Sequence, residues 1–180
     1  MRNLTMVCAS LVLLSLNLTT VRTHNDANLV DSTNRTLKEK EPGWKCTALL
    51  SRSSKPALES PQGISYEFRC TREEQSILGY VFYGNSKHDA VRTLERSQQF
   101  LQINDSRPLK GIGEQAYEYA NHGIAWLTFR QDNVFVQLNV GIVDPHKMDD
   151  SLPEMKSLTA EALEIAKRFA QYIVRQIRAT

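Results

Sequence analysis

The sequence lacks the short motifs by which many enzymes are identified. It contains no G-x-S-x-G segment, and no two of its four histidines stand at H-x-x-x-H spacing. These absences exclude the nucleophile turn of an α/β-hydrolase and a zinc-binding helix. The three cysteines form no C-x-x-C pair, which excludes the common redox motif. We therefore assign no catalytic residue and no cofactor, and we expect a non-enzymatic function.

A surplus of basic residues is also missing. The 180 residues include 22 Lys and Arg against 20 Asp and Glu. Residues 1–23 contain Arg2 and Arg22 and no acidic residue, so their removal leaves 20 basic and 20 acidic side chains. Domains that bind nucleic acids carry a clustered basic surplus. We therefore expect no nucleic-acid partner.

Only one long apolar run is present, and it lies at the N-terminus. It extends from Leu4 to Leu18, follows Arg2 and ends in small polar residues. This pattern is typical of a secretory signal peptide, here residues 1–23. The run has about 15 residues, fewer than the roughly 20 that a membrane-spanning helix requires. The sequence thus predicts export to the periplasm or the extracellular space, and membrane contact only if the segment stays uncleaved.

Cysteine is scarce, and its distribution indicates a structural role. Cys8 lies inside the predicted signal peptide, which leaves Cys46 and Cys70. An even number of cysteines in a chain sent to an oxidising compartment favours a disulfide. We predict a disulfide bond between Cys46 and Cys70. In the chain-entropy model, closing this loop stabilises the folded protein by roughly 3 kcal/mol.

The remainder of the chain divides into a tether and one domain. Residues 24–43 are polar and predict a disordered tether. Residues 44–180 are sufficient for a single core. Alternating or dense apolar runs predict strands, and apolar residues at helical spacing predict helices. The predicted strands are residues 44–50, 64–70, 76–83, 117–119, 124–130 and 134–140, and the predicted helices are residues 86–101 and a C-terminal helix starting at Ser157 or Thr159.

This order of elements predicts an α+β fold. Short connections favour a single antiparallel β-sheet of about five to six strands, with the two main helices packed against it. Residues 76–83 have the composition of a strand buried on both faces. We favour helices on both sides of the sheet, although the pattern leaves open whether the two helices share one face.

The segment from Gly111 to Tyr117, followed by Trp126 to Val134, resembles a pattern in small exported bacterial proteins of unassigned function. In that pattern a G-x-G-[DE]-x-A turn precedes an aromatic strand, an Arg-x-x-Asn hairpin and a C-terminal helix. Some of these proteins resemble the PsbP/Mog1-like α+β group. The resemblance implies the fold and export, and it implies no catalytic residue.

Two groups of residues are candidates for binding an unknown protein, an envelope component or a small ligand. Gly111 and Gly113 can expose backbone N–H groups to an anion, although a backbone bend is the favoured interpretation. Phe135 lies on a strand whose other face is formed by Val134, Val136 and Leu138, and Trp126 and Tyr119 are further aromatic candidates on the neighbouring strands. They are therefore either covered by helices or part of an exposed binding surface.

Two alternative functions stay open. Glu114, His122 and His146 could converge from loops into an active site of an unrecognised class. The protein could also be a structural envelope component that associates with itself through an uncovered sheet face. One loop holds a weak candidate cation site, for which a solvated acidic connection is the favoured interpretation. Its residues are Asp144, His146, Asp149 and Asp150.

Overall fold

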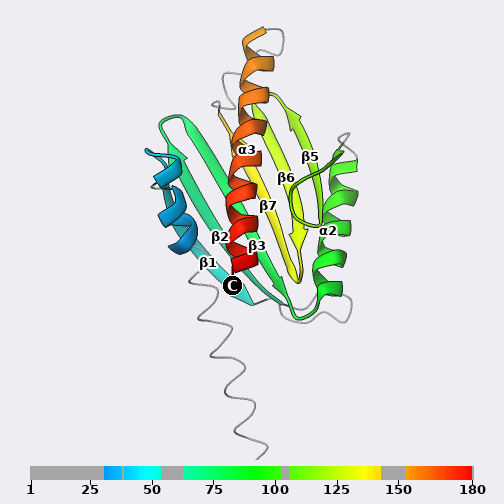
Figure 1. Ribbon diagram of the computed structural model, residues 1–180. Helices are drawn as coiled ribbons and strands as arrows, with labels where there is room; N and C mark the ends of the chain where they lie inside the picture. The colour runs from blue at the N-terminus through cyan, green and yellow to red at the C-terminus, as the bar shows by residue number, and fades with distance from the viewer. Residues whose placement is uncertain (1–30, 38, 54–62, 103–105, 143–152, 180) are drawn as a thin grey trace, which may run out of the picture.

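A computed structural model describes residues 31–37, 39–53, 63–102, 106–142 and 153–179. The predicted signal peptide lies outside these ranges. One sheet and the helices packed on it account for the described chain (Figure 1). The elements are the N-terminal helix (residues 31–37 and 39–40), β1 (Lys45–Ser53), β2 (Gly63–Arg72), β3 (Gln75–Gly84), α2 (Lys87–Gln102), β4 (Arg107–Leu109), β5 (Gln115–Asn121), β6 (Ile124–Gln131), β7 (Val134–Gly141) and α3 (Pro153–Ala179).

The sheet has the strand order β1-β2-β3-β7-β6-β5-β4, and every neighbouring pair is antiparallel. This confirms the predicted α+β class with a single antiparallel sheet. The sheet has seven strands rather than five or six, because β4 is too short to show an alternating pattern. Pro108 is tolerated in β4 because an edge strand has one unpaired side.

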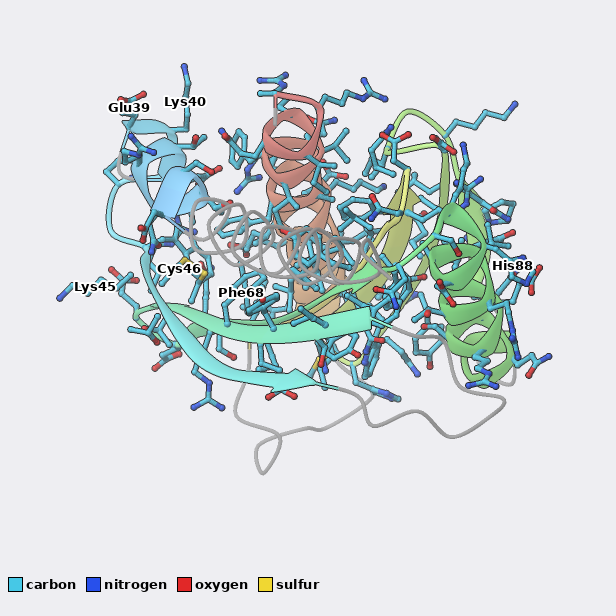
Figure 2. The ribbon with its side chains drawn as sticks, turned by 90° about the horizontal axis from the view of Figure 1, so that it is seen from below. Glu39, Lys40, Lys45, Cys46, Phe68 and His88 are labelled. Atoms are coloured by element: carbon cyan, nitrogen blue, oxygen red, sulfur yellow. A yellow bond between two sulfur atoms is a disulfide. The ribbon has the colours of Figure 1, made fainter. Side chains whose placement is uncertain are left out.

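The two main helices cover opposite faces of the sheet. Successive side chains of a strand point to opposite faces. In β7, Val134 and Val136 join the main core with Phe169 of α3, whereas Phe135 packs with Leu94 of α2. In the view from below, α3 and α2 lie on the two sides of the yellow strands (Figure 2). The arrangement with helices on both faces, which the sequence favours, is therefore the one observed.

A capping box formed by Ser86 and Asp89 starts α2, close to the predicted helix start at residue 86. The Ser86 backbone N–H donates to the Asp89 carboxylate at 3.0 Å, and the Asp89 N–H donates to the Ser86 hydroxyl at 3.3 Å. These bonds satisfy two backbone donors that an uncapped helix leaves unpaired. The short polar sequence around Ser86 thus determines where α2 begins.

The C-terminal helix begins earlier than predicted, at Pro153. Thr159 lies inside the helix, where its hydroxyl donates to the Met155 carbonyl and accepts the Gly123 N–H, both at 2.8 Å. The residue that we expected to cap α3 therefore ties it to the β5–β6 turn. The apolar residues at helical spacing in this helix are Ala162, Ala166, Phe169, Ala170, Ile173 and Ile177; the first five are buried, and Ile177 is half-buried.

The N-terminal helix occupies part of the segment 24–43, where the sequence favours a tether. Leu37 is only 1% exposed and belongs to the main core. The buried Glu41 carboxylate accepts a hydrogen bond from Arg168 of α3 at 2.7 Å. Leu37 in the core and the ion pairs of Glu41 with Arg168 and Arg72 thus hold a polar segment on the domain, whereas residues 24–30 lie outside the described ranges.

The predicted disulfide pair is present in the structure. Cys46 and Cys70 are direct register partners on β1 and β2, and their Cα atoms are 4.0 Å apart. Cys46 lies close to the N-terminal helix (Figure 2). The bond therefore joins the edge strand β1 to the rest of the sheet next to the point where the N-terminal helix attaches.

Candidate functional site

The G-x-G segment between β4 and β5 is a backbone bend. Gly113 has a φ of +58°, and a Cβ added there would lie 2.4 Å from the Arg130 carbonyl oxygen. The following N–H, that of Glu114, donates to the same oxygen at 2.9 Å. Gly111 has a φ of +85°, but a side chain there would meet no atom within 4 Å. The close approach of two backbone segments explains why position 113 requires glycine, and no bound anion is needed to explain it.

The Glu114 carboxylate is held by three hydrogen-bond donors. It accepts hydrogen bonds from the Lys87 ammonium at 2.8 Å, from the Arg130 guanidinium and from the Asp132 backbone N–H at 3.3 Å. The Lys87 hydrogen bond is the largest of the effects that lower the pKa of Glu114, and the pKa falls from 4.5 to about 2 even though partial desolvation raises it. A carboxylate with so low a pKa is a weak general base at neutral pH.

The motif residues that carry the resemblance connect three separate segments. Glu114 precedes β5, Arg130 belongs to β6, and Lys87 opens α2. The Asn133 side-chain amide donates to the Gly84 carbonyl at 2.8 Å, and the Asn133 backbone carbonyl accepts a hydrogen bond from the Gly84 N–H at 2.8 Å. Both halves of the motif therefore fix the start of α2 against the β6–β7 turn.

The described residues of the enzymatic hypothesis lie far apart. Glu114 precedes β5 and His122 follows it. At about 3.3 Å per residue, this places the two backbone positions roughly 25 Å apart. The other residues of that hypothesis and of the cation site lie outside the described ranges: Asp144, His146, Asp149 and Asp150. Within the described ranges, no group of three or more His, Cys, Asp or Glu side chains is placed to hold a metal ion.

Phe135 belongs to the core between the sheet and α2. Its side chain is 1% exposed and packs in one cluster with Phe82, Ala90 and Leu94. The Tyr80 ring lies edge-on to it, with 6.3 Å between ring centroids. Of the three aromatic candidates, Phe135 is therefore the one whose burial in the core explains its presence without a ligand.

Tyr119 and Trp126 lie on the same face as Phe135 but outside the cluster around α2. Direct register partners line up there across five strands. We call this set the cross-strand row, and its members are Arg69 of β2, Leu78 of β3, Asn139 of β7, Trp126 of β6 and Tyr119 of β5. Neighbouring strands are about 4.8 Å apart, so the row is about 19 Å long.

The cross-strand row presents apolar surface to solvent. Leu78 is 42% exposed, and no other large hydrophobic side chain among the described residues is exposed to this extent. Trp126 and Tyr119 are half-buried, with ring centroids 5.3 Å apart and ring planes inclined by 37°. Asn139 is half-buried between Leu78 and Trp126, and Arg69 is exposed.

The polar groups of the row are mainly hydrogen-bond donors. The Trp126 indole and the Arg69 guanidinium only donate, whereas the Asn139 amide and the Tyr119 hydroxyl donate and accept. Arg69 makes no ion pair with any residue that the structure describes. The neighbouring carboxylate on this face is Glu67, which is half-buried two positions earlier in β2.

Trp126 and Tyr119 are binding candidates on the sequence alone, whereas Arg69, Leu78 and Asn139 are not recognisable there as members of the row. We expected residues 76–83 to be buried on both faces, but the exposure of Leu78 shows that only the part of β3 near α2 is covered. The two-residue turn between β2 and β3 pairs Arg72 with Gln75 and hence Arg69 with Leu78. The short turn is therefore the feature of the sequence from which the pairing of Arg69 with Leu78 could have been predicted.

Comparison of the chain with protein-family models, with curated proteins and with solved structures gives no match. Within the described ranges, no helix combines the length and the apolar character needed to cross a membrane. The geometry of the site is therefore the basis for any functional interpretation.

Proposed function

We propose that this protein is an exported, non-enzymatic binding domain whose ligand lies on the cross-strand row. The observation that carries the proposal is the half-exposed pair of Trp126 and Tyr119, aligned with the exposed Leu78. Apolar side chains grouped at a surface and mixed with polar groups are typical of interaction sites. The covered part of the same face has a full structural explanation in α2, whereas the row has none.

The other candidate residues support a binding role rather than catalysis. Glu114 is engaged by Lys87 and Arg130 and lies at the far end of β5 from His122. The apolar N-terminal run and the Cys46–Cys70 bond fit a protein that leaves the cytosol. A rigid sheet that presents a few side chains from adjacent strands suits recognition, because their relative positions are fixed by register.

Tryptophan fluorescence offers a first test. The chain has two tryptophans, and Trp44 is only 5% exposed. A Trp44→Phe variant reports on Trp126 alone, and a Trp126→Phe variant reports on Trp44 alone. We expect acrylamide to quench Trp126 several times more strongly than Trp44. Equal, weak quenching of both would show that the row is covered and would refute the proposal.

A photo-crosslinking amino acid at position 78 tests binding in the exported protein. We expect a covalent adduct that disappears when Trp126→Ala is introduced. The matched control places the same group at Gln171, which is exposed on α3, and should give no such adduct. An adduct with a second copy of the chain would instead support self-association, and the absence of any adduct would count against the proposal.

A further inference from the structure

This inference rests on the proposed function and concerns the class of ligand. We infer that the cross-strand row binds a proline-rich peptide segment that carries an acidic residue four or five positions away from its prolines. Four properties of the row lead to this ligand: its area, its direction across the strands, the chemistry of its polar groups, and the spacing between Arg69 and Trp126.

The area of the row favours a short linear ligand over a folded partner. The row is about 19 Å long, and its width is the distance between residues i and i+2 of one strand, about 7 Å. It therefore offers on the order of 150 Å² of flat surface. A stable interface between folded proteins buries about 800 Å² on each partner. A second copy that docked on this row alone would therefore be held too weakly, whereas a short segment can use the whole row.

The direction of the row excludes the commonest way in which sheets bind peptides. A peptide that adds a strand must lie along a sheet edge, parallel to the strands. The row crosses five strands at right angles on a face, so a ligand lying along it cannot pair with the sheet backbone. Polyproline II conformation meets this condition, because its backbone is already extended and needs no internal or neighbouring backbone bonds.

The polar groups of the row match a ligand rich in acceptors. Trp126 and Arg69 can only donate hydrogen bonds, and Asn139 and Tyr119 can also donate. Proline has no backbone N–H, so a proline-rich segment presents carbonyl acceptors without competing donors. Proline rings also pack well on aromatic side chains, as in known recognition of such segments. The Trp126–Tyr119 pair supplies those rings.

The spacing of the row places the acidic residue. Arg69 on β2 and Trp126 on β6 are three inter-strand steps apart, about 14 Å. Polyproline II rises about 3.1 Å per residue, so 14 Å corresponds to four or five residues. A Glu or Asp at that distance from the prolines on Trp126 would reach Arg69, which makes no ion pair with a described residue.

The test is a scan of acidic position in synthetic peptides. Each peptide contains one Pro-Pro pair in a neutral, extended context and a single Glu between two and eight residues away. Binding is followed by Trp126 fluorescence in the exported Trp44→Phe protein. We expect the tightest binding at an offset of four or five. Replacing Glu by Gln in the best peptide should weaken binding about threefold to fivefold, the range for an exposed ion pair.

Matched variants identify the contacts. In Arg69→Gln protein, the Glu and Gln peptides should bind equally. Arg107→Gln changes an exposed arginine on β4 whose register partner Glu118 pairs with α3, so it lies on the other face and should preserve the preference. Binding that does not depend on the offset, or a preference that survives Arg69→Gln, would overturn the inference.

A neutral oligosaccharide, chitohexaose, separates the failure of the inference from the failure of the proposed function. If this sugar changes Trp126 fluorescence and the peptides do not, the row is a binding site but the peptide class is wrong. If neither probe binds and Trp126 is shielded from acrylamide, both proposals fail.

Discussion

Replacing Glu114 by Gln should destabilise the protein at neutral pH and leave its stability nearly unchanged in acid. In the native protein the carboxylate accepts hydrogen bonds from Lys87, Arg130 and the Asp132 N–H. A glutamine of nearly the same size keeps the shape but removes the charge. The variant therefore measures the electrostatic connection between α2, β6 and the β6–β7 turn.

The size of the effect follows from the pKa. A fall of the Glu114 pKa from 4.5 to about 2 corresponds to at most about 3 kcal/mol. The side chain is 27% exposed, and solvent screens its interactions, so we expect about 1 kcal/mol. Because the folded-state pKa is the lower one, this stabilisation is present above pH 4.5 and is lost as the pH falls towards 2.

Urea denaturation at pH 7 and pH 2.5 gives the measurement. At a typical slope of the unfolding free energy against urea concentration, a loss of about 1 kcal/mol in that free energy lowers the urea midpoint by about 0.5 M at pH 7. Most of this difference from the natural protein should disappear at pH 2.5. Glu95→Gln, an exposed position on α2, is the control and should change little. An unchanged midpoint for Glu114→Gln at pH 7, or a difference of equal size at both pH values, would refute the reasoning.

Three further predictions concern the fold. Gly113→Ala should lower the free energy of unfolding, followed by thermal denaturation, by about 2 kcal/mol, and Gly111→Ala should lower it by about 1 kcal/mol. Both glycines have a positive φ, but only Gly113 faces a close backbone oxygen. A larger loss for Gly111→Ala than for Gly113→Ala would contradict this prediction. Serine at both disulfide cysteines should cost roughly 3 kcal/mol. Intact-mass analysis of residues 24–180, produced in an oxidising compartment, should find no free thiol, and two free thiols would be the contrary result. Deleting residues 1–30 should leave the unfolding temperature unchanged. Deleting residues 1–43 should lower the free energy of unfolding by at least about 2 kcal/mol, because Leu37 is then missing from the core. Equal stability of the two truncated proteins would show that the N-terminal helix is not part of the fold.

Elements whose signals are local could be predicted from the sequence. The alternation of Val134, Val136 and Leu138 with polar or aromatic neighbours defines β7 and its core face without reference to any other strand. Ser86 and Asp89 define the start of α2 by a pattern of four residues, Ser-x-x-Asp. In each case the residues that determine the structure lie next to one another in the chain.

Features that depend on distant residues could not be predicted in the same way. Leu37 is a single apolar residue in a polar segment, and it is buried only because α3 and the strands supply the rest of its surroundings. Glu114 resembles an ordinary solvated carboxylate until α2 brings Lys87 and β6 brings Arg130 to it. Burial and charge pairing of this kind appear only when the order and register of the strands are known.

The position of α2 on the sheet decides which aromatic residue is part of the core and which is a binding candidate. Phe135 and Trp126 lie on adjacent strands and on the same face, so periodicity cannot distinguish them. Phe135 lies near the end of the sheet where Lys87 and Glu114 anchor the start of α2, and α2 covers it. Trp126 pairs with Asn139 nearer the other end of the strands, outside the α2 cluster. In the proposed binding function, the ion pairs of Glu114 with Lys87 and Arg130 have an indirect role: they fix where α2 starts on the sheet and thereby which aromatic side chains α2 leaves uncovered.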